Sequence, residues 1–283
     1  MSDVTVHLTG GLGNQMFQYA LGRRLSIERN CELYLDTSFY NTYKSFGYGL
    51  NNYNINAKKI NNKRIFNNKY IRFTIKKINA LGYNSFKKKY YEKKLFMYDD
   101  NVLNEKYDTY YGTWQSFKYF ENIRTVLLND FTIKANLSDG MGIYLREITS
   151  SESVSLHIRR GDYFKNERLQ KKHGLLTLDY YYNAIRNFPN NSVYFIFSDD
   201  INWVKNNFNI NKELVFIELK KNSPEIEINL MSMCKCNIIS NSTFSWWAAW
   251  LNENERKIII APQRWYANKK TSLDLVPDKW IQI

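Results

Sequence analysis

The sequence predicts an α/β protein of two domains, each built on a doubly wound parallel sheet. From residue 154 onward, apolar strand-like runs alternate with helix-like segments, which is the pattern of parallel sheets. The first 36 residues begin with strand, glycine turn, helix and strand in the same order. The length of 283 residues suits two domains of about 140 residues each. We therefore expect domains at residues 1–150 and 151–283, facing each other across a cleft.

In the first half of the chain, the sequence pattern predicts clear elements at the start but has no clear period in the middle. Strands are expected at residues 4–8 and 32–36, with a helix between them from about residue 15 to residue 29. Residues 41–135 are rich in asparagine, lysine and aromatic residues without a clear period, and we expect mostly helices there. The polar stretch at residues 136–153 is the expected boundary between the domains.

In the second half of the chain, strand-like and helix-like segments alternate clearly. Strands are expected at residues 154–158, 193–197, 214–217, 237–240 and 257–261. Helices are expected at residues 178–188, 201–207, 224–233 and 243–252. Ser223 and Pro224 suit the N-cap and first turn of the third of these helices.

The three cysteines and the start of the chain favour a cytoplasmic protein. Cys31, Cys234 and Cys236 lack the spacing of a zinc finger or of a redox pair, which predicts reduced thiols. No charged and apolar leader follows Met1, and no apolar run reaches the roughly 18 residues of a membrane span. We expect a chain that is neither secreted nor membrane-spanning.

Positive charge is concentrated in one segment. The net charge is +13, and residues 58–94 contain thirteen Lys or Arg residues against one acid, Glu92, which gives 13 − 1 = +12. Aromatic residues are interleaved with these charges, a composition that suits an anionic membrane surface. Nucleic acid would be attracted by the same field, and a solvated basic insertion explains the composition as well.

Polar residues follow the expected strands of the second half. They are His157 to Asp162, Ser198 to Asp200, Glu218, residues 240–243 and Gln263 with Arg264. Because carboxyl ends of parallel strands share one edge of a sheet, these groups should converge there. Arg159 and Arg160 suit a phosphate or pyrophosphate, although an arginine pair in a solvated turn is the simpler interpretation of that stretch alone.

Two loops could present backbone amides to an anion. The turn at residues 9–15 has Gly11 and Gly13 but Met16 at the third position of a dinucleotide fingerprint, and it lacks the Gly-Lys-Ser/Thr ending of a P-loop. Close backbone approach to a ligand and a tight structural turn both explain its glycines, and Asn14 could hydrogen-bond a sugar or phosphate oxygen. The second loop begins at Ser240 and leads into a helix, where its hydroxyls suit either an anion or plain capping.

Other residues of the second half suggest roles of their own. Asp199 suits either recognition of a purine or capping of the helix that follows it. Trp246, Trp247 and Trp250 are expected in the core or in packing between the domains, rather than stacked on a substrate. No two aspartates have DxD spacing and the three histidines do not pair at metal-ligand spacing, so no metal site and no cofactor are expected.

Four motifs together resemble one enzyme family. They are GGLGNQMFQYA at residues 10–20, YLDTS at residues 34–38, HIRRGDY at residues 157–163 and SNSTFSWW at residues 240–247. In this order they are similar to the bacterial α-1,2-fucosyltransferases of glycosyltransferase family 11. The resemblance implies a GT-B fold, GDP-β-L-fucose as donor, inversion at its anomeric carbon without an obligate metal, and the 2-hydroxyl of a galactosyl residue as acceptor. It also implies a role in the biosynthesis of O-antigen or another polysaccharide.

The resemblance also implies site residues. Arg159 would hold the diphosphate, with His157 and Asp162 shaping the donor site and Arg160 supporting the loop. Three further hydroxyls, those of Ser242, Thr243 and Ser245, would contact phosphates. Asp199 would read guanine, and Asn14 would act from the glycine loop with Gly11 and Gly13.

A base for the acceptor hydroxyl is not identified by the sequence. Asp162 and Asp36 both follow strands, and Asn14, a water or the phosphate could serve a dissociative transition state. Three rival functions stay open: another nucleotide-sugar transferase, a basic nucleic-acid-binding protein and a catalytically silent carbohydrate-binding module. For residues 58–94 we expect docking on the inner face of the cytoplasmic membrane, near a lipid-linked acceptor, and no nucleic acid partner.

Overall fold

The computed structural model describes residues 2–43, 46–61, 88–104, 107–134, 141–160, 174–219, 223–266 and 274–283. The chain divides into two compact units, Met1–Asn51 with Ile55–Asp130, and Asn52–Asn54 with Phe131–Ile283. This division assigns residues 131–150 to the second unit, whereas the sequence placed the boundary at residue 150. Most of the basic segment lies outside the described residues.

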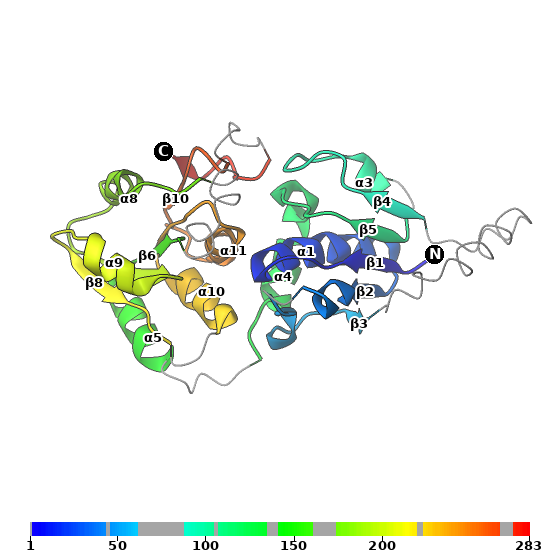
Figure 1. The fold of residues 1–283 in the computed structure, drawn as a ribbon, viewed down its shortest axis with the longest axis horizontal. Coiled ribbons are helices and arrows are strands. Elements are labelled where there is room, and N and C mark those ends of the chain that lie inside the picture. The colour runs from blue at the N-terminus through cyan, green and yellow to red at the C-terminus, as the bar shows by residue number, and fades with distance from the viewer. Residues whose placement is uncertain are drawn as a thin grey trace, which may run out of the picture. The chain divides into compact units, whose positions relative to one another are not determined.

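Unit 1 contains a parallel sheet with the strand order β3-β2-β1-β5-β4 (Figure 1). Its strands are β1 (Val4–His7), β2 (Leu33–Asp36), β3 (Lys58–Ile60), β4 (Lys89–Tyr91) and β5 (Thr109–Tyr111). Its helices are α1 (Leu12–Arg29), α3 (Asn101–Asn104) and α4 (Arg124–Asp130), with short 3₁₀ turns at Ser38–Asn41, Leu50–Asn52, Phe117–Tyr119 and Glu121–Ile123.

Helix α1 lies against one face of this sheet. A Cβ atom added at Gly22 would come within 2.7 Å of side-chain atoms of Val6 and Leu33, so glycine permits this close packing. Val6 and Leu33 are buried. Because strand side chains alternate, the neighbouring positions His7 and Asp36 belong to the opposite face.

The prediction of mostly helices at residues 41–135 is confirmed only in part for the described residues, because α3, α4 and three 3₁₀ turns lie there together with three strands that it missed. Strands β3, β4 and β5 lie there, each only three residues long. Alternation of polar and apolar residues needs about four to eight positions to be read, so such short strands leave no periodic signal. They are recognisable only through their partners in the sheet.

Unit 2 contains a second parallel sheet with the order β11-β10-β9-β6-β7-β8. Its strands are β6 (Glu152–Ile158), β7 (Ser192–Ser198), β8 (Glu213–Phe216), β9 (Cys236–Ile238), β10 (Ile259–Ala261) and β11 (Ile281–Gln282). Its helices are α5 (Met141–Ser150), α8 (Leu178–Ile185), α9 (Ile201–Asn207), α10 (Pro224–Met233) and α11 (Thr243–Leu251). The predicted alternation of strand and helix is confirmed, and β11 and α5 are additions that the sequence did not predict.

The interior of unit 2 explains the apolar runs that predicted its strands. Val154, Leu156, Ile158 and Ile196 are buried together with the inner faces of α8 and α9. Trp246 and Trp247 are fully buried and Trp250 is nearly so, which confirms that these tryptophans belong to the core. The indole of Trp246 donates to the Leu275 carbonyl at 2.8 Å.

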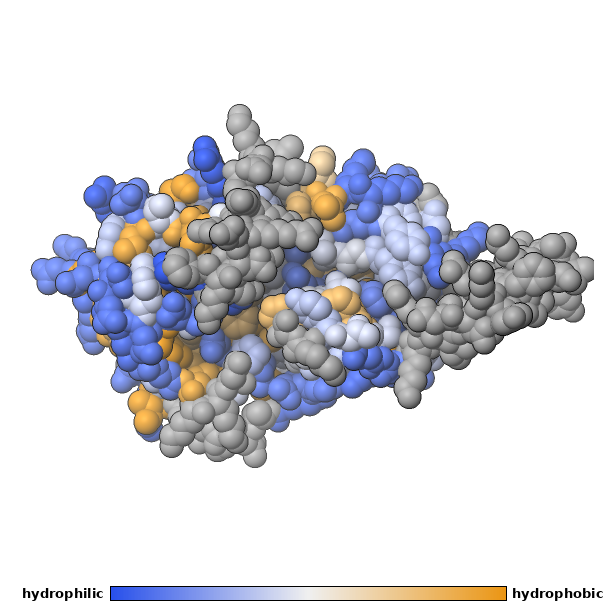
Figure 2. Space-filling model, viewed as in Figure 1, coloured by the Kyte–Doolittle hydropathy of each residue, from blue (hydrophilic) through white to orange (hydrophobic). Residues whose placement is uncertain are grey.

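None of the helices in the described ranges is both long and apolar enough to cross a bilayer. On the face drawn in Figure 2, hydrophilic residues predominate among those described, and hydrophobic residues form small separate groups. All three cysteines are free thiols, as predicted.

Candidate functional site

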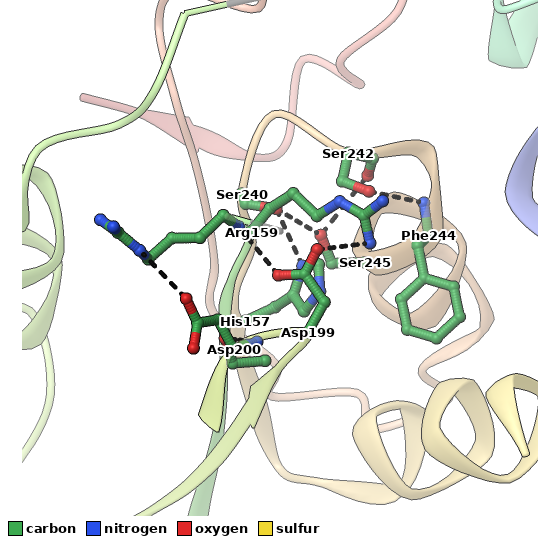
Figure 3. Close-up of polar contacts among 10 residues, drawn as sticks. His157, Arg159, Asp199, Asp200, Ser240, Ser242, Phe244 and Ser245 are labelled. Carbon is green, nitrogen blue, oxygen red and sulfur yellow. Dashed lines mark hydrogen bonds and ion pairs between the residues drawn. The ribbon is translucent and has the colours of Figure 1, made fainter. Parts of the chain in front are cut away.

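An arginine and an aspartate meet at the carboxyl ends of β6 and β7. The guanidinium of Arg159 lies 3.1 Å from the Asp199 carboxylate, with 22% and 23% of the two side chains exposed (Figure 3). The other carboxylate oxygen of Asp199 accepts the backbone N–H of Arg160 at 2.9 Å. Asp199 therefore fixes both the backbone and the guanidinium of the arginine loop while leaving part of Arg159 accessible.

Asp199 does not cap the helix that follows it. The N-cap of α9 is Asp200, whose carboxylate accepts the N–H of Trp203 at 3.4 Å. The capping interpretation of Asp199 is therefore wrong. A role in reading guanine stays a prediction, and any such contact would share a carboxylate whose two oxygens already have partners.

Arg160 turns to a different set of partners from Arg159. Its guanidinium carbon lies 3.4 Å from the centroid of the Trp203 ring, and its Nε lies 3.8 Å from the Asp200 carboxylate. A stacked guanidinium of this kind stabilises the loop. The two neighbouring arginines thus divide their tasks, one facing the carboxyl edge of the sheet and the other packing on α9.

His157 connects β6 to the loop before α11. Its Nδ1 lies 2.8 Å from Ser240 Oγ, and its ring lies 5.6 Å from the Phe244 ring. Burial, reinforced by the positive charge of Arg159, lowers the pKa of His157 to about 3. The imidazole is therefore neutral at physiological pH and positions the loop rather than binding an anion by charge.

The three predicted hydroxyls of α11 lie in different surroundings. Ser242 is the N-cap, and its Oγ accepts the Phe244 N–H at 3.3 Å. Ser245 is fully buried and its Oγ lies 3.4 Å from both Ser240 Oγ and the Ser242 carbonyl. Thr243, at the first helical position, is partly exposed. Among these hydroxyls, Thr243 is the best placed to meet a ligand, whereas Ser245 braces the loop from inside.

Glu227 is a residue that the sequence did not assign to the site. It lies in the first turn of α10, which follows β8. Burial, with the negative charge of Asp199 as the next cause, raises the pKa of Glu227 to about 7, and Arg159 acts in the opposite direction. Glu227 is therefore within electrostatic range of the Arg159–Asp199 pair. Its only sequence signal was its position after the carboxyl end of a strand.

Asp162, the remaining predicted residue of this motif, lies outside the described residues. Within the parts of the chain that the structure describes, no group of three or more His, Cys, Asp or Glu side chains could hold a metal ion. The positive charge for an anionic ligand would come from Arg159 and from the amino end of α11, whose dipole favours negative charge.

The glycine loop of unit 1 begins its helix earlier than predicted. Gly11 is the N-cap of α1, and Gly13 is buried in the first turn. A Cβ atom at Gly11 would meet only ordinary contact, 3.5 Å from the Phe46 ring. Gly10 has a φ of 74°, and a Cβ atom there would come within 2.5 Å of Asn14 Nδ2. The strict requirement for glycine is therefore at Gly10.

The orientation of Asn14 follows from one contact. Gln115 Nε2 donates to Asn14 Oδ1 at 2.8 Å, so the carbonyl end of the Asn14 amide is engaged. Asn14 Nδ2 then provides donors, which suits contact with a sugar or phosphate oxygen and does not suit proton abstraction. Gln115 was not predicted from the sequence, because it follows a strand of only three residues.

The chain is similar to several known proteins. The chain is 38% identical to an alpha-1,2-colitosyltransferase of Escherichia coli, over 100% of this chain and 99% of that protein. It is 35% identical to the O-antigen biosynthesis glycosyltransferase WbnK of Escherichia coli, over 98% and 99% of the two chains. A galactoside 2-alpha-L-fucosyltransferase SEC1 of Bos taurus is 28% identical over 48% of this chain and 40% of its own length.

Among solved structures, the fucosyltransferase NodZ from Bradyrhizobium is similar with a TM-score of 0.52, 11% identity and coverage of 88% of this chain and 93% of that one. At this identity the likeness concerns the fold, which is of the GT-B type. The sequence model of glycosyl transferase family 11 matches residues 1–283. The chain therefore belongs to glycosyltransferase family 11.

Proposed function

We propose that this glycosyltransferase transfers L-fucose from GDP-β-L-fucose to the 2-hydroxyl of a galactosyl residue, with inversion to an α-1,2 linkage. The acceptor would be a cell-surface glycan or its lipid-linked precursor. The observation that carries the proposal is the Arg159–Asp199 pair beside the amino end of α11, within a chain that matches the family from end to end. The SEC1 relative, named for 2-alpha-L-fucosyl transfer to galactosides, supports the choice of sugar and linkage.

The site residues support this chemistry through charge. Negative charge accumulates on the departing GDP as the bond to the anomeric carbon breaks, so donors to the phosphates act more strongly in the transition state than in the ground state. Arg159 and the amino end of α11 would supply those donors, with Thr243 at its exposed side. No obligate metal is needed for this scheme, and we propose that none is used.

A second donor has support from one observation. The relative with 38% identity over the whole chain is named for transfer of colitose. A phosphate-binding arginine does not distinguish one GDP-activated deoxysugar from another. The alternative is therefore a GDP-colitose donor on the same site with the same linkage.

The experiment compares donors directly. Purified protein is incubated with GDP-fucose, GDP-colitose and GDP-mannose in the presence of β-1,3- and β-1,4-galactosides, and GDP release and the linkage of the product are followed by NMR. An α-1,2-fucosylated galactoside as the preferred product supports the proposal. A preference for GDP-colitose would transfer the assignment to the alternative donor, and turnover of neither would reject both.

A further inference from the structure

A histidine–aspartate pair lies at the carboxyl edge of the unit 1 sheet. His7, the last residue of β1, is in register with Asp36 at the end of β2 and with Tyr111 at the end of β5. These three side chains share the face opposite α1. Ligands of parallel α/β sheets bind outside the carboxyl ends of the strands, so this row stands where chemistry is expected.

Hydrogen bonding fixes the tautomer of His7. Its Nδ1 lies 3.2 Å from Asp36 Oδ2, while Asp36 Oδ1 accepts the Ser38 N–H at 3.0 Å. Hydrogen bonds from His7 and Ser38 lower the pKa of Asp36 although burial opposes them. An ionised carboxylate only accepts hydrogen bonds, so the proton of a neutral His7 must reside on Nδ1. The lone pair is then on Nε2.

Packing holds this imidazole in place. The Tyr111 ring lies 5.1 Å from the His7 ring, and Tyr91 stacks on the other side of Tyr111 at 4.9 Å. The His7 side chain is 16% exposed and that of Asp36 is 9% exposed. Within the described part of the chain, no residue hydrogen-bonds His7 Nε2. The aspartate is thus enclosed with both oxygens occupied, whereas the imidazole has an unused acceptor and access to solvent.

We propose that His7, oriented by Asp36, accepts the proton of the acceptor hydroxyl during sugar transfer. The inference rests on the proposed function, because it assigns a role within that reaction. Histidine held by a carboxylate through Nδ1 is a recurrent arrangement for a general base. His7 is also a better candidate base than Asp36, because both carboxylate oxygens of Asp36 already accept hydrogen bonds.

The step balances without any further reactant. The hydroxyl O–H bond of the acceptor breaks and its proton passes to the lone pair on His7 Nε2. The hydroxyl oxygen forms a bond to the anomeric carbon of the donor sugar. The bond from that carbon to the phosphate oxygen breaks, and its electron pair leaves with the nucleoside diphosphate. The imidazolium, stabilised by the Asp36 carboxylate, later returns its proton to water.

The first test replaces His7 with glutamine, which retains a polar side chain but has no basic nitrogen. A general base contributes typically about 10²–10⁴-fold to rate, so kcat for transfer should fall by that factor. Hydrolysis of the donor in the absence of acceptor and the affinity for GDP should change less than threefold. Tyr34→Phe is the matched control, because Tyr34 lies on the same face, two residues before Asp36 on β2, and should transfer like the parent.

The second test examines the positioning role of Asp36. Asp36→Asn would place an amide donor opposite Nδ1, move the His7 proton to Nε2 and lower kcat at least tenfold. Nitrogen-15 NMR of the imidazole reports this tautomer directly, and a merely structural role would not alter it. The result expected is an Nδ1–H tautomer in the parent and an Nε2–H tautomer in Asp36→Asn.

Three results would overturn the proposal. One is transfer by His7→Gln within threefold of the parent, and another is an Nε2–H tautomer of His7 in the parent protein. The third is a loss of donor hydrolysis and GDP affinity in His7→Gln as large as its loss of transfer, with an unchanged thermal midpoint, which would mean that His7 supports donor binding and not proton transfer from the acceptor. Absence of transfer by the parent itself would instead reject the proposed function, while the NMR measurement would still test the dyad.

Discussion

Replacing Arg159 with alanine tests the donor site most sharply. Loss of one donor to developing charge costs about 10²–10³ in rate, or roughly 3–4 kcal/mol of transition-state stabilisation. The same change removes an ion pair of 3.1 Å between side chains that are 22% and 23% exposed. A partly exposed pair of this kind contributes only about 1 kcal/mol to stability. The kinetic loss should therefore be much larger than the structural loss.

The assay separates these two quantities. Transfer is measured as kcat/KM from GDP release, and stability is measured as the thermal midpoint, which should fall by about 2–4 °C for a domain of 150–250 residues. Arg186→Ala, at the exposed carboxyl end of α8, removes the same charge from the same unit and should leave both values unchanged. Transfer by Arg159→Ala within threefold of the parent would refute the reasoning.

Two further predictions follow from the structure, and a third follows from the charge of the sequence. Glu227 has its pKa raised from 4.5 to about 7, so its stabilising protonated form is fully present below about pH 4.5 and is lost as the pH rises through 7. The thermal midpoint of Glu227→Gln should therefore exceed that of the parent by a margin that grows between pH 5 and pH 8, and a margin independent of pH would contradict this. Ser242→Ala removes the N-cap of α11 and should cost about 1 kcal/mol of unfolding free energy, measured by urea denaturation against Ser232→Ala, near the carboxyl end of α10. An equal loss of unfolding free energy in both serine variants would show that the Ser242 cap adds no stability of its own. The basic residues 58–94 should bind liposomes that contain anionic lipid, and sedimentation indifferent to lipid charge and to salt would count against membrane docking.

The sequence predicted unit 2 well because β6 and β7 are seven residues long and largely buried, and because the short strands β9 and β10 lie in apolar stretches between predicted helices. Residues 154–158 carry Val154, Leu156 and Ile158 at alternate positions on a strand that has neighbours on both sides, and such a pattern is readable without any alignment. The helices at residues 201–207 and 224–233 were predicted with the boundaries that the structure gives. Proline in the first turn, at Pro224, supplied a local signal that tertiary structure did not override.

The middle of unit 1 was not predictable for the opposite reason. Tyr91 and Tyr111 are terminal residues of three-residue strands whose positions are set by the pairing of β5 with β1 and of β4 with β5, not by local composition. The partnership of His7 with Asp36 has the same origin, since 29 residues separate them and only the pairing of β1 with β2 brings them together. Gln115 and Glu227 likewise acquire their neighbours from tertiary structure.

The most direct test of the donor site is a crystal structure of the protein with GDP bound. We expect the diphosphate within hydrogen-bonding distance of Arg159 and of the first turn of α11, at the carboxyl ends of β6, β7 and β9. We also expect that binding persists in EDTA. A diphosphate bound away from Arg159, or bound only through a metal ion, would contradict the central claim.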